Sequence, residues 1–241
     1  MIEIRQLIKS FGKFRALDDI SLSLKGHQAI SLLGSNGSGK TTLIKSILGL
    51  VIPESGSISV NGKEVKHGYS YRADIGFMPQ IGRYPDNMTI GQVINMVREM
   101  RSDVRAYDED LIRDFGIEGL KNKVMRTLSG GTRQKVSACL AFLFNPGILI
   151  LDEPTAGLDP LSSEILRAKI SNEREKGKLI LITSHVLSDL EGLASEVIYL
   201  QDGKLMFHRR VRDILESAGE EKLNKAVAKL MRSVSHGGEE K

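Results

Sequence analysis

The chain has 241 residues, of which 41% are hydrophobic and 27% are charged, as is typical of a soluble globular protein. No apolar run approaches the ~20 residues of a membrane-spanning helix, and the first residues lack the apolar core of a secretion signal, so we expect a cytoplasmic protein that does not itself cross a bilayer. The net charge of +4 arises from 34 basic and 30 acidic residues that are interspersed, and this pattern does not favour a nucleic-acid-binding surface.

Residues suited to metal binding or redox chemistry are few. The five histidines show no ligand spacing, which disfavours a metal site built from protein side chains alone. The single cysteine, Cys139, excludes an intramolecular disulfide, and its apolar neighbours predict a buried position in a helix.

The N-terminal region predicts a small, mostly antiparallel β lobe. Residues 1–33 alternate polar and apolar side chains as short strands do, with Gly12 and Gly26 as turn residues. The stretch from Gly56 to Gly62 has the pattern of a strand that runs into a turn.

The most informative feature of the chain is the run Gly34-Ser35-Asn36-Gly37-Ser38-Gly39-Lys40-Thr41-Thr42. It follows an apolar stretch and has the G-x-x-x-x-G-K-[ST] spacing of a phosphate-binding loop. Glycines allow backbone N–H groups to approach one anion, and a helix beginning near Lys40 points its partly positive N-terminus at the same place. Lys40 is then expected to contact the β- and γ-phosphates, and the Thr41 hydroxyl to bind Mg²⁺. The alternatives are a glycine-rich turn that binds nothing and a dinucleotide fingerprint, which lacks its third glycine here.

The middle of the chain predicts an inserted helical lobe from about residue 85 to residue 145. Apolar residues such as Ile90, Val93 and Ile94 recur there at helical spacing, and Asn145-Pro146-Gly147 ends the last helix.

The following segments predict a buried parallel sheet covered by helices, and thus an α/β fold. Apolar strands at 148–151 and 179–183 alternate with predicted helices at 162–176 and 186–194. The tail from residue 211 is predicted to be helical and charged, with a disordered end from Ser233 to Lys241.

Two carboxylates follow the apolar strand at 148–151. Asp152 is expected at the carboxyl edge of a central strand, beside the phosphate-binding loop, where it would hold Mg²⁺ through water. Glu153 can face the attacking water and act as a general base. The alternative is a strand end with two solvated acids.

A second helix N-terminus suited to an anion is predicted at Ser129-Gly130-Gly131. Because this motif and the phosphate-binding loop lie in different lobes, the simplest arrangement is a two-fold, head-to-tail dimer in which each motif caps the γ-phosphate held by the partner's Lys40. A plain serine N-cap is the alternative.

Together these motifs resemble the nucleotide-binding subunit of ATP-binding-cassette (ABC) transporters over roughly residues 1–215. The matching segments are the loop 34–42, the signature 128–131, the acidic strand end 148–153, the loop Ala156-Gly157-Leu158-Asp159 and the pair Ser184-His185. The resemblance implies a P-loop NTPase (RecA-like) core with an N-terminal antiparallel β lobe and an inserted helical lobe, followed by a short tail at 216–241.

The resemblance also implies roles for single residues. Phe11 matches the aromatic residue that stacks on adenine, and Gln80 matches the glutamine that touches Mg²⁺ and the attacking water. His185 matches the histidine at the γ-phosphate, and Asp159 the loop that crosses the dimer seam. Thr132 stands where the family often has glutamine, methionine or glutamate.

For function, the resemblance implies an ATPase that dimerises on ATP and Mg²⁺ and moves a separate membrane permease. It also implies that the ATPase is bound peripherally at the inner face of the cell membrane through this permease. The docking surface is expected around residues 80–100, where Met88, Met96 and Met100 favour an apolar contact surface over a thioether metal site. The single short cassette resembles exporter-type subunits, and residues 78–87 resemble cassettes associated with copper-site maturation of nitrous oxide reductase. The alternatives are a soluble ABC ATPase acting on ribosomes or nucleic acid and a binding-only pseudo-ATPase.

Overall fold

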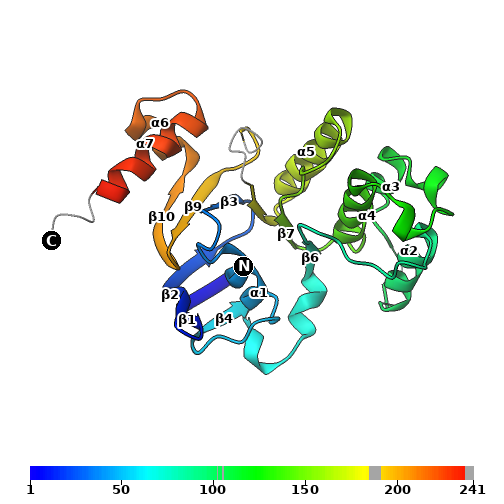
Figure 1. The fold of residues 1–241 in the computed structure, drawn as a ribbon, viewed down its shortest axis with the longest axis horizontal. Coiled ribbons are helices and arrows are strands. Elements are labelled where there is room, and N and C mark those ends of the chain that lie inside the picture. The colour runs from blue at the N-terminus through cyan, green and yellow to red at the C-terminus, as the bar shows by residue number, and fades with distance from the viewer. Residues whose placement is uncertain (102, 105, 185–190, 237–241) are drawn as a thin grey trace.

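The computed structural model describes residues 1–101, 103–104, 106–184 and 191–236, and its strands form two sheets with helices around them (Figure 1). Within these residues, none of the helices is both long enough and apolar enough to cross a membrane. The predicted α/β class, with an antiparallel sheet and a largely parallel one, is confirmed.

The first sheet is antiparallel and has four strands in the order β2-β1-β4-β5. Its inner face is apolar, since Ile2, Ile4 and Leu7 of β1 are buried. A two-residue turn joins β1 to β2, and Gly12 in this turn has a φ of +59°, which glycine adopts without strain. The strands are β1 (Ile2–Phe11), β2 (Phe14–Leu24), β4 (Ser55–Val60) and β5 (Lys63–Glu64).

The second sheet has six strands in the order β10-β9-β3-β8-β7-β6. All neighbouring pairs are parallel except β10 with β9. Parallel strands end at the same edge of a sheet, so the segments that follow β3, β6, β7 and β8 meet there. The strands are β3 (Ala29–Leu33), β6 (Ile75–Met78), β7 (Ile148–Asp152), β8 (Leu179–Thr183), β9 (Glu196–Gln201) and β10 (Lys204–Arg210).

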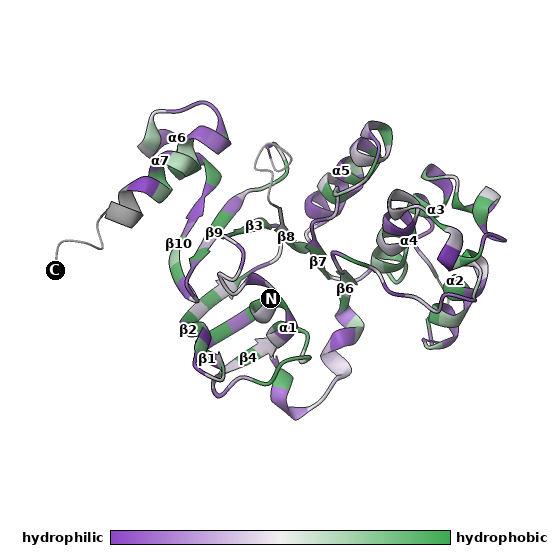
Figure 2. Ribbon diagram, viewed as in Figure 1, coloured by the Kyte–Doolittle hydropathy of each residue, from purple (hydrophilic) through white to green (hydrophobic). Residues whose placement is uncertain are grey.

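Alternate residues of the parallel strands serve two separate cores. On β3, Ile30 and Leu32 pack with the antiparallel sheet and helix α1 (Lys40–Ile47), whereas Ala29 and Leu33 pack on the opposite face with the helices. Both faces are therefore covered, and the central strands β3, β7 and β8 are mostly hydrophobic (Figure 2).

The helical segment between β6 and β7 lies at one end of the molecule (Figure 1). Thr89 and Gln92 form a capping box at the start of α2, and Cys139 on α4 is buried as predicted. The α-helices are α2 (Ile90–Glu99), α3 (Asp110–Asp114) and α4 (Gly130–Phe142), followed after β7 by α5 (Pro160–Glu175). The 3₁₀ helices are η1 (Val65–His67), η2 (Ser70–Asp74), η3 (Ile117–Leu120) and η4 (Met125–Thr127).

The C-terminal segment forms two helices, α6 (Val211–Ala218) and α7 (Leu223–His236). Buried residues of both helices, Ile214 and Val227 among them, belong to the core that also contains Val197 and Tyr199 of β9. Helix α7 continues from Ser233 to His236, where the sequence favoured a disordered end. Of the helix predicted at 186–194, residues 186–190 lie outside the described residues and 191–193 form a turn, not a helix.

Candidate functional site

A polar cavity of about 390 Å³ opens at the carboxyl edge of the parallel sheet. Four segments that are far apart in the sequence contribute to it: the start of β2, the loop and helix start after β3, the segment just after β6, and the end of β7. Its lining residues are Phe14, Asn36, Gly37, Ser38, Gly39, Lys40, Thr41, Thr42, Gln80, Asp152 and Glu153. The cavity thus unites most of the predicted phosphate, Mg²⁺ and base residues.

The glycines of the phosphate-binding loop are required by close packing. A Cβ atom on Gly34 would lie 2.5 Å from the Leu200 carbonyl oxygen, and one on Gly39 would lie 2.4 Å from the Ala16 carbonyl oxygen. Gly39 also has a φ of +105°, which side chains rarely adopt. Among the described residues, the buried Ser38 Oγ has no hydrogen-bond partner, so the loop keeps polar capacity for a bound anion.

Lys40 places its ammonium group within the same loop. Its Nζ donates hydrogen bonds to the carbonyl oxygens of Gly34, at 2.6 Å, and Ser35, at 3.0 Å. Burial lowers the pKa of the Lys40 ammonium, while the carboxylates of Asp152 and Glu153 act in the opposite direction. Helix α1 begins at Lys40 and has no acidic residue in its first turn, so its N-terminus adds to the attraction for phosphate.

Thr183 at the end of β8 contacts both acidic residues, Asp152 through its carboxylate and Glu153 through its backbone. Its hydroxyl donates a hydrogen bond to Asp152 Oδ1 and accepts one from the Glu153 backbone N–H at 3.0 Å. Glu153 has a φ of +51°, a conformation that a non-glycine residue keeps only where its surroundings impose it. Gln134 on α4 is buried, and its Nε2 donates to the Glu153 carbonyl oxygen at 3.1 Å.

Ser129, Gly130 and Gly131 lie outside the residues that line this cavity. Ser129 is the N-cap of α4 and accepts a hydrogen bond from the Thr132 N–H at 3.2 Å. A Cβ atom on Gly131 would lie 2.7 Å from the Gly157 carbonyl oxygen, so the start of α4 packs closely on the loop before α5. The predicted second anion site is therefore separate from the first within one chain.

Asp159 contacts helix α4, whose start is the predicted second anion site. It caps α5 by accepting from the Ser162 N–H at 2.9 Å, and it forms a 2.9 Å ion pair with Lys135 of α4. Hydrogen bonds from Lys135 and Ser162 hold the pKa of the Asp159 carboxyl well below its usual range. The residue predicted to lie at a dimer seam is thus fixed beside the start of α4.

Phe11 is not among the residues that line the cavity. Phe11 ends β1 and is 52% exposed, but Phe14, across the hairpin, is the aromatic residue that lines the cavity. His185 lies outside the described residues. Sequence reasoning missed Phe14, Thr183 and Gln134, because only their neighbours in the fold distinguish them.

The donors in the cavity suit Mg²⁺ bound together with a nucleotide. Thr41, Gln80 and Asp152, the predicted metal residues, supply hydroxyl, amide and carboxylate oxygens, which this hard cation prefers. Within the described part of the chain no group of three or more His, Cys, Asp or Glu side chains could hold a metal ion alone. This donor set fits a cation that shares its coordination shell with water and phosphate.

Comparison with known sequences agrees with this geometry. The family model described as ABC transporter matches residues 17–156. The ABC transporter ATP-binding protein NatA of Bacillus subtilis is 33% identical over 229 residues, covering 92% of this chain and 93% of NatA. The lipopolysaccharide export system ATP-binding protein LptB of Haemophilus influenzae is 30% identical over 215 residues, covering 86% of this chain and 89% of LptB.

Solved structures show the same fold. An ATP-binding subunit of an ABC transporter matches with a TM-score of 0.86 at 28% identity, covering 96% of this chain and 99% of that one. A dimeric ATP-binding cassette, solved in a post-hydrolysis state with ADP and Pi, matches with a TM-score of 0.77 at 24% identity, covering 87% of this chain and 98% of that one.

The chain belongs to the ABC transporter family, and within it to the ATP-binding cassettes. It is an ATPase with the P-loop NTPase fold that its motifs predicted. The resemblance of residues 78–87 to copper-maturation cassettes stays a hypothesis, since no relative named above is described by that process.

Proposed function

We propose that this chain is the ATP-hydrolysing subunit of an ABC exporter, which dimerises head-to-tail on ATP and Mg²⁺ and moves a separate membrane permease. One observation carries the proposal: the cavity with Lys40 and the Asp152-Glu153 pair does not include the start of α4, where Ser129 is followed by two glycines. A γ-phosphate held in the cavity can therefore meet Ser129 only if a second copy supplies it.

Within one chain, different residues bind the phosphates, activate the attacking water and would hold Mg²⁺. The loop amides and Lys40 bind the phosphates and orient the terminal one, while Glu153 accepts the proton of the attacking water. Thr41, Asp152 and Gln80 would hold Mg²⁺, which neutralises charge on the phosphate oxygens. The imposed backbone of Glu153 directs its carboxylate, and Gln134 and Thr183 keep that backbone in place.

A mixture of two inactive variants tests whether each ATP site is built from residues of both chains. In a mixture of Lys40→Ala and Ser129→Arg, each heterodimer has one site with both defects and one site with neither. We therefore expect ATP hydrolysis to reappear in the mixture, although each variant alone is inactive. The measurement is steady-state phosphate release at constant total protein.

The double variant Lys40→Ala/Ser129→Arg, mixed with wild-type chain, is the matched control. Its heterodimers have one defect in each site, so activity should not exceed that of the remaining wild-type dimers. If the two single variants fold and associate but their mixture stays inactive, the proposal that the partner chain completes each ATP site is wrong.

The permease is proposed to dock at a second cavity, of about 410 Å³, between β6 and the end of α4, and so beside residues 80–100, where the sequence favoured the docking surface, and not within them. Phe77, Leu140 and Phe144 make its lining apolar, while Arg72 and Arg101 lie at the same cavity. The Arg101 guanidinium lies 4.6 Å from the centre of the Phe144 ring. This surface suits a permease segment that carries an apolar side chain next to an acidic one.

Arg101→Glu is expected to abolish capture of the permease without lowering the ATPase rate of the isolated cassette. The measurement is recovery of a membrane-spanning protein from a detergent extract by the tagged chain, with the exposed Arg209→Glu as control. Equal recovery by Arg101→Glu and wild type would contradict this docking site. Recovery of only ribosomes or DNA would favour the alternative of a soluble ABC ATPase.

Export is proposed as the direction because relatives such as LptB are named for an export system. Contact with a permease would place the chain at the cytoplasmic face of the cell membrane. The cargo is then selected by the permease, since the proposed cassette surfaces bind nucleotide, a second copy and the permease.

A further inference from the structure

Thr183 carries a buried hydroxyl group at the edge of the sheet where the nucleotide cavity opens. It is the last residue of β8, it is 1% exposed, and it is the parallel-strand partner of Asp152 on β7. Thr183 does not line the cavity, whereas Asp152 and Glu153 do. Its side chain can therefore influence a bound nucleotide or cation only through its neighbours, and these two acidic residues are its direct hydrogen-bond partners.

The hydroxyl group of Thr183 has one proton, and its two partners fix where that proton goes. The backbone N–H of Glu153 can only donate, so at 3.0 Å it occupies a lone pair of Thr183 Oγ1. An ionised carboxylate can only accept, so the hydroxyl proton is donated to Asp152 Oδ1. A hydrogen bond to an ionised group is stronger than one between neutral groups. The Thr183 hydroxyl therefore restrains the rotation of the Asp152 carboxylate.

The two acidic residues depend on this hydroxyl to different degrees. The Glu153 N–H also donates to the Thr183 carbonyl oxygen at 3.2 Å, and the Glu153 carbonyl oxygen accepts from Gln134 Nε2 at 3.1 Å. In the part of the chain that the structure describes, the Asp152 carboxylate has no hydrogen bond except the one from Thr183. Removal of the hydroxyl would therefore leave the Glu153 backbone held but free the Asp152 carboxylate.

We propose that Thr183 is a positioning residue for the cation of the site and that it acts through Asp152. The inference rests on the proposed function, in which Asp152 holds Mg²⁺ together with Thr41 and Gln80. The hydrogen bond to Oδ1 leaves Oδ2 of Asp152 for the cation or for its bound water. Replacement of a residue that supports a metal-binding group in this way typically lowers metal affinity or activity by about 10- to 100-fold.

Thr183→Val tests this role, because valine is also β-branched, favours strands and lacks the hydroxyl. The first readout is the affinity for ADP, which is not hydrolysed, measured by calorimetry once with Mg²⁺ and once with EDTA in its place. We expect the affinity in EDTA to equal that of the wild-type chain. Most of the gain in affinity that Mg²⁺ gives the wild-type chain should be lost in Thr183→Val.

The second readout is the free Mg²⁺ concentration that gives half of the maximal rate of ATP hydrolysis at saturating ATP. Thr183→Val is expected to raise this concentration by about 10- to 100-fold. Thr183→Ser keeps the hydroxyl and should behave as wild type in both measurements. Ser31→Ala is the matched control, since it removes a buried hydroxyl of the adjacent strand β3 that has no hydrogen-bond partner among the described residues.

The inference and the proposed function fail in different ways. If Thr183→Val has both wild-type ADP affinities and the wild-type Mg²⁺ dependence, Thr183 does not position the cation, and the proposed function still stands. An equal loss of ADP affinity with Mg²⁺ and with EDTA would mean that Thr183 only supports the fold of the cavity, and this also overturns the inference. If the wild-type chain binds ADP under neither condition, the proposed function itself is wrong.

Urea unfolding shows whether Thr183→Val is folded. If it is not, Thr183→Ala, which also lacks the hydroxyl but has a smaller side chain, takes its place in both measurements with the same expected results.

Discussion

Glu153→Gln is expected to lower the rate of ATP hydrolysis by about 10²- to 10⁴-fold, the usual contribution of a general base. The amide keeps the shape and the backbone contacts of the glutamate, including those to Thr183 and Gln134, but it cannot take a proton from water. Binding of ATP should therefore persist while turnover stops. Steady-state phosphate release and calorimetric binding on the same preparation measure the two effects.

The same variant should accumulate as an ATP-bound dimer, because the γ-phosphate that joins the two chains is not removed. Light scattering after gel filtration, with and without ATP and Mg²⁺, gives the mass directly. Glu175→Gln, an exposed glutamate at the end of α5, is the control and should behave as wild type. Turnover by Glu153→Gln at the wild-type rate would refute its assignment as the base.

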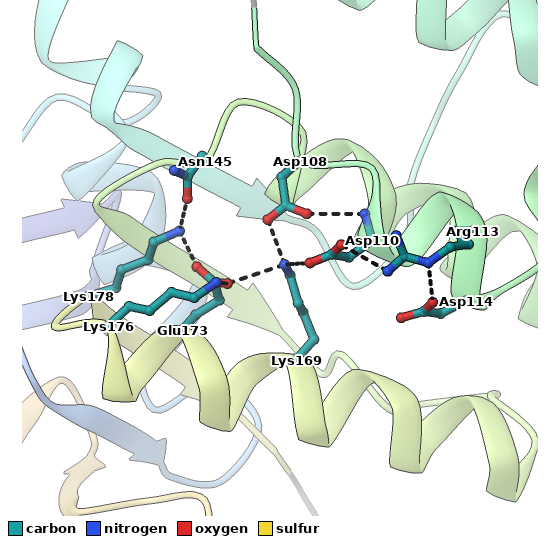
Figure 3. A network of polar contacts seen from close by, with 9 residues as sticks. All are labelled: Asp108, Asp110, Arg113, Asp114, Asn145, Lys169, Glu173, Lys176 and Lys178. Atoms are coloured by element: carbon teal, nitrogen blue, oxygen red, sulfur yellow. Dashed lines mark hydrogen bonds and ion pairs between the residues drawn. The ribbon is translucent and has the colours of Figure 1, made fainter.

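Lys169→Met is expected to reduce the free energy of unfolding by about 3 kcal/mol, at the lower end of the range for breaking a buried ion pair. Lys169 Nζ bonds Asp108 Oδ2 at 2.6 Å and Asp110 Oδ2 at 2.8 Å, and its side chain is 6% exposed (Figure 3). It also forms a 3.2 Å ion pair with Glu173, whose side chain is fully buried. Methionine fills a similar volume but leaves these carboxylates without their shared cation.

This network connects α5 with the segment that leads into α3, and Glu173 extends it to Lys176 and Lys178 (Figure 3). Urea unfolding at neutral pH measures the loss. The exposed pair of Lys121 and Glu118 supplies the control, since Lys121→Met should change stability by less than about 1 kcal/mol. Equal stabilities for Lys169→Met and Lys121→Met would contradict a stabilising role for the network.

Glu173 makes the same network sensitive to acid. Burial alone would raise the pKa of the Glu173 carboxyl, but hydrogen bonds from Lys176 and Lys178 and the charges of Lys178 and Lys169 lower it to about 2, from an ordinary value of 4.5. A carboxyl with a lowered pKa in the folded state stabilises the fold above pH 4.5, and this contribution disappears as the pH falls toward 2. Glu173→Gln should lack this part of the acid destabilisation, which urea unfolding at a series of pH values measures.

The sequence by itself determined the features that depend on neighbouring residues. The spacing of Gly34, Gly39 and Lys40 defines a loop whose glycines prove sterically necessary at both ends. The apolar run before Asp152 predicted a buried strand with its acids at the carboxyl edge, since such a run can be buried on both faces of a parallel sheet. These patterns are local, so the identity of the residues is sufficient to recognise them.

Only the tertiary structure decided which residues support these motifs. Thr183 and Gln134 reach the backbone of Glu153 from another strand and another helix, and neither has a distinctive sequence context. Asp108 and Lys169 are 61 positions apart, and each alone has the pattern of a solvated charge. Hydrogen bonds and ion pairs depend on distance in space, and the pairing of strands and helices sets that distance.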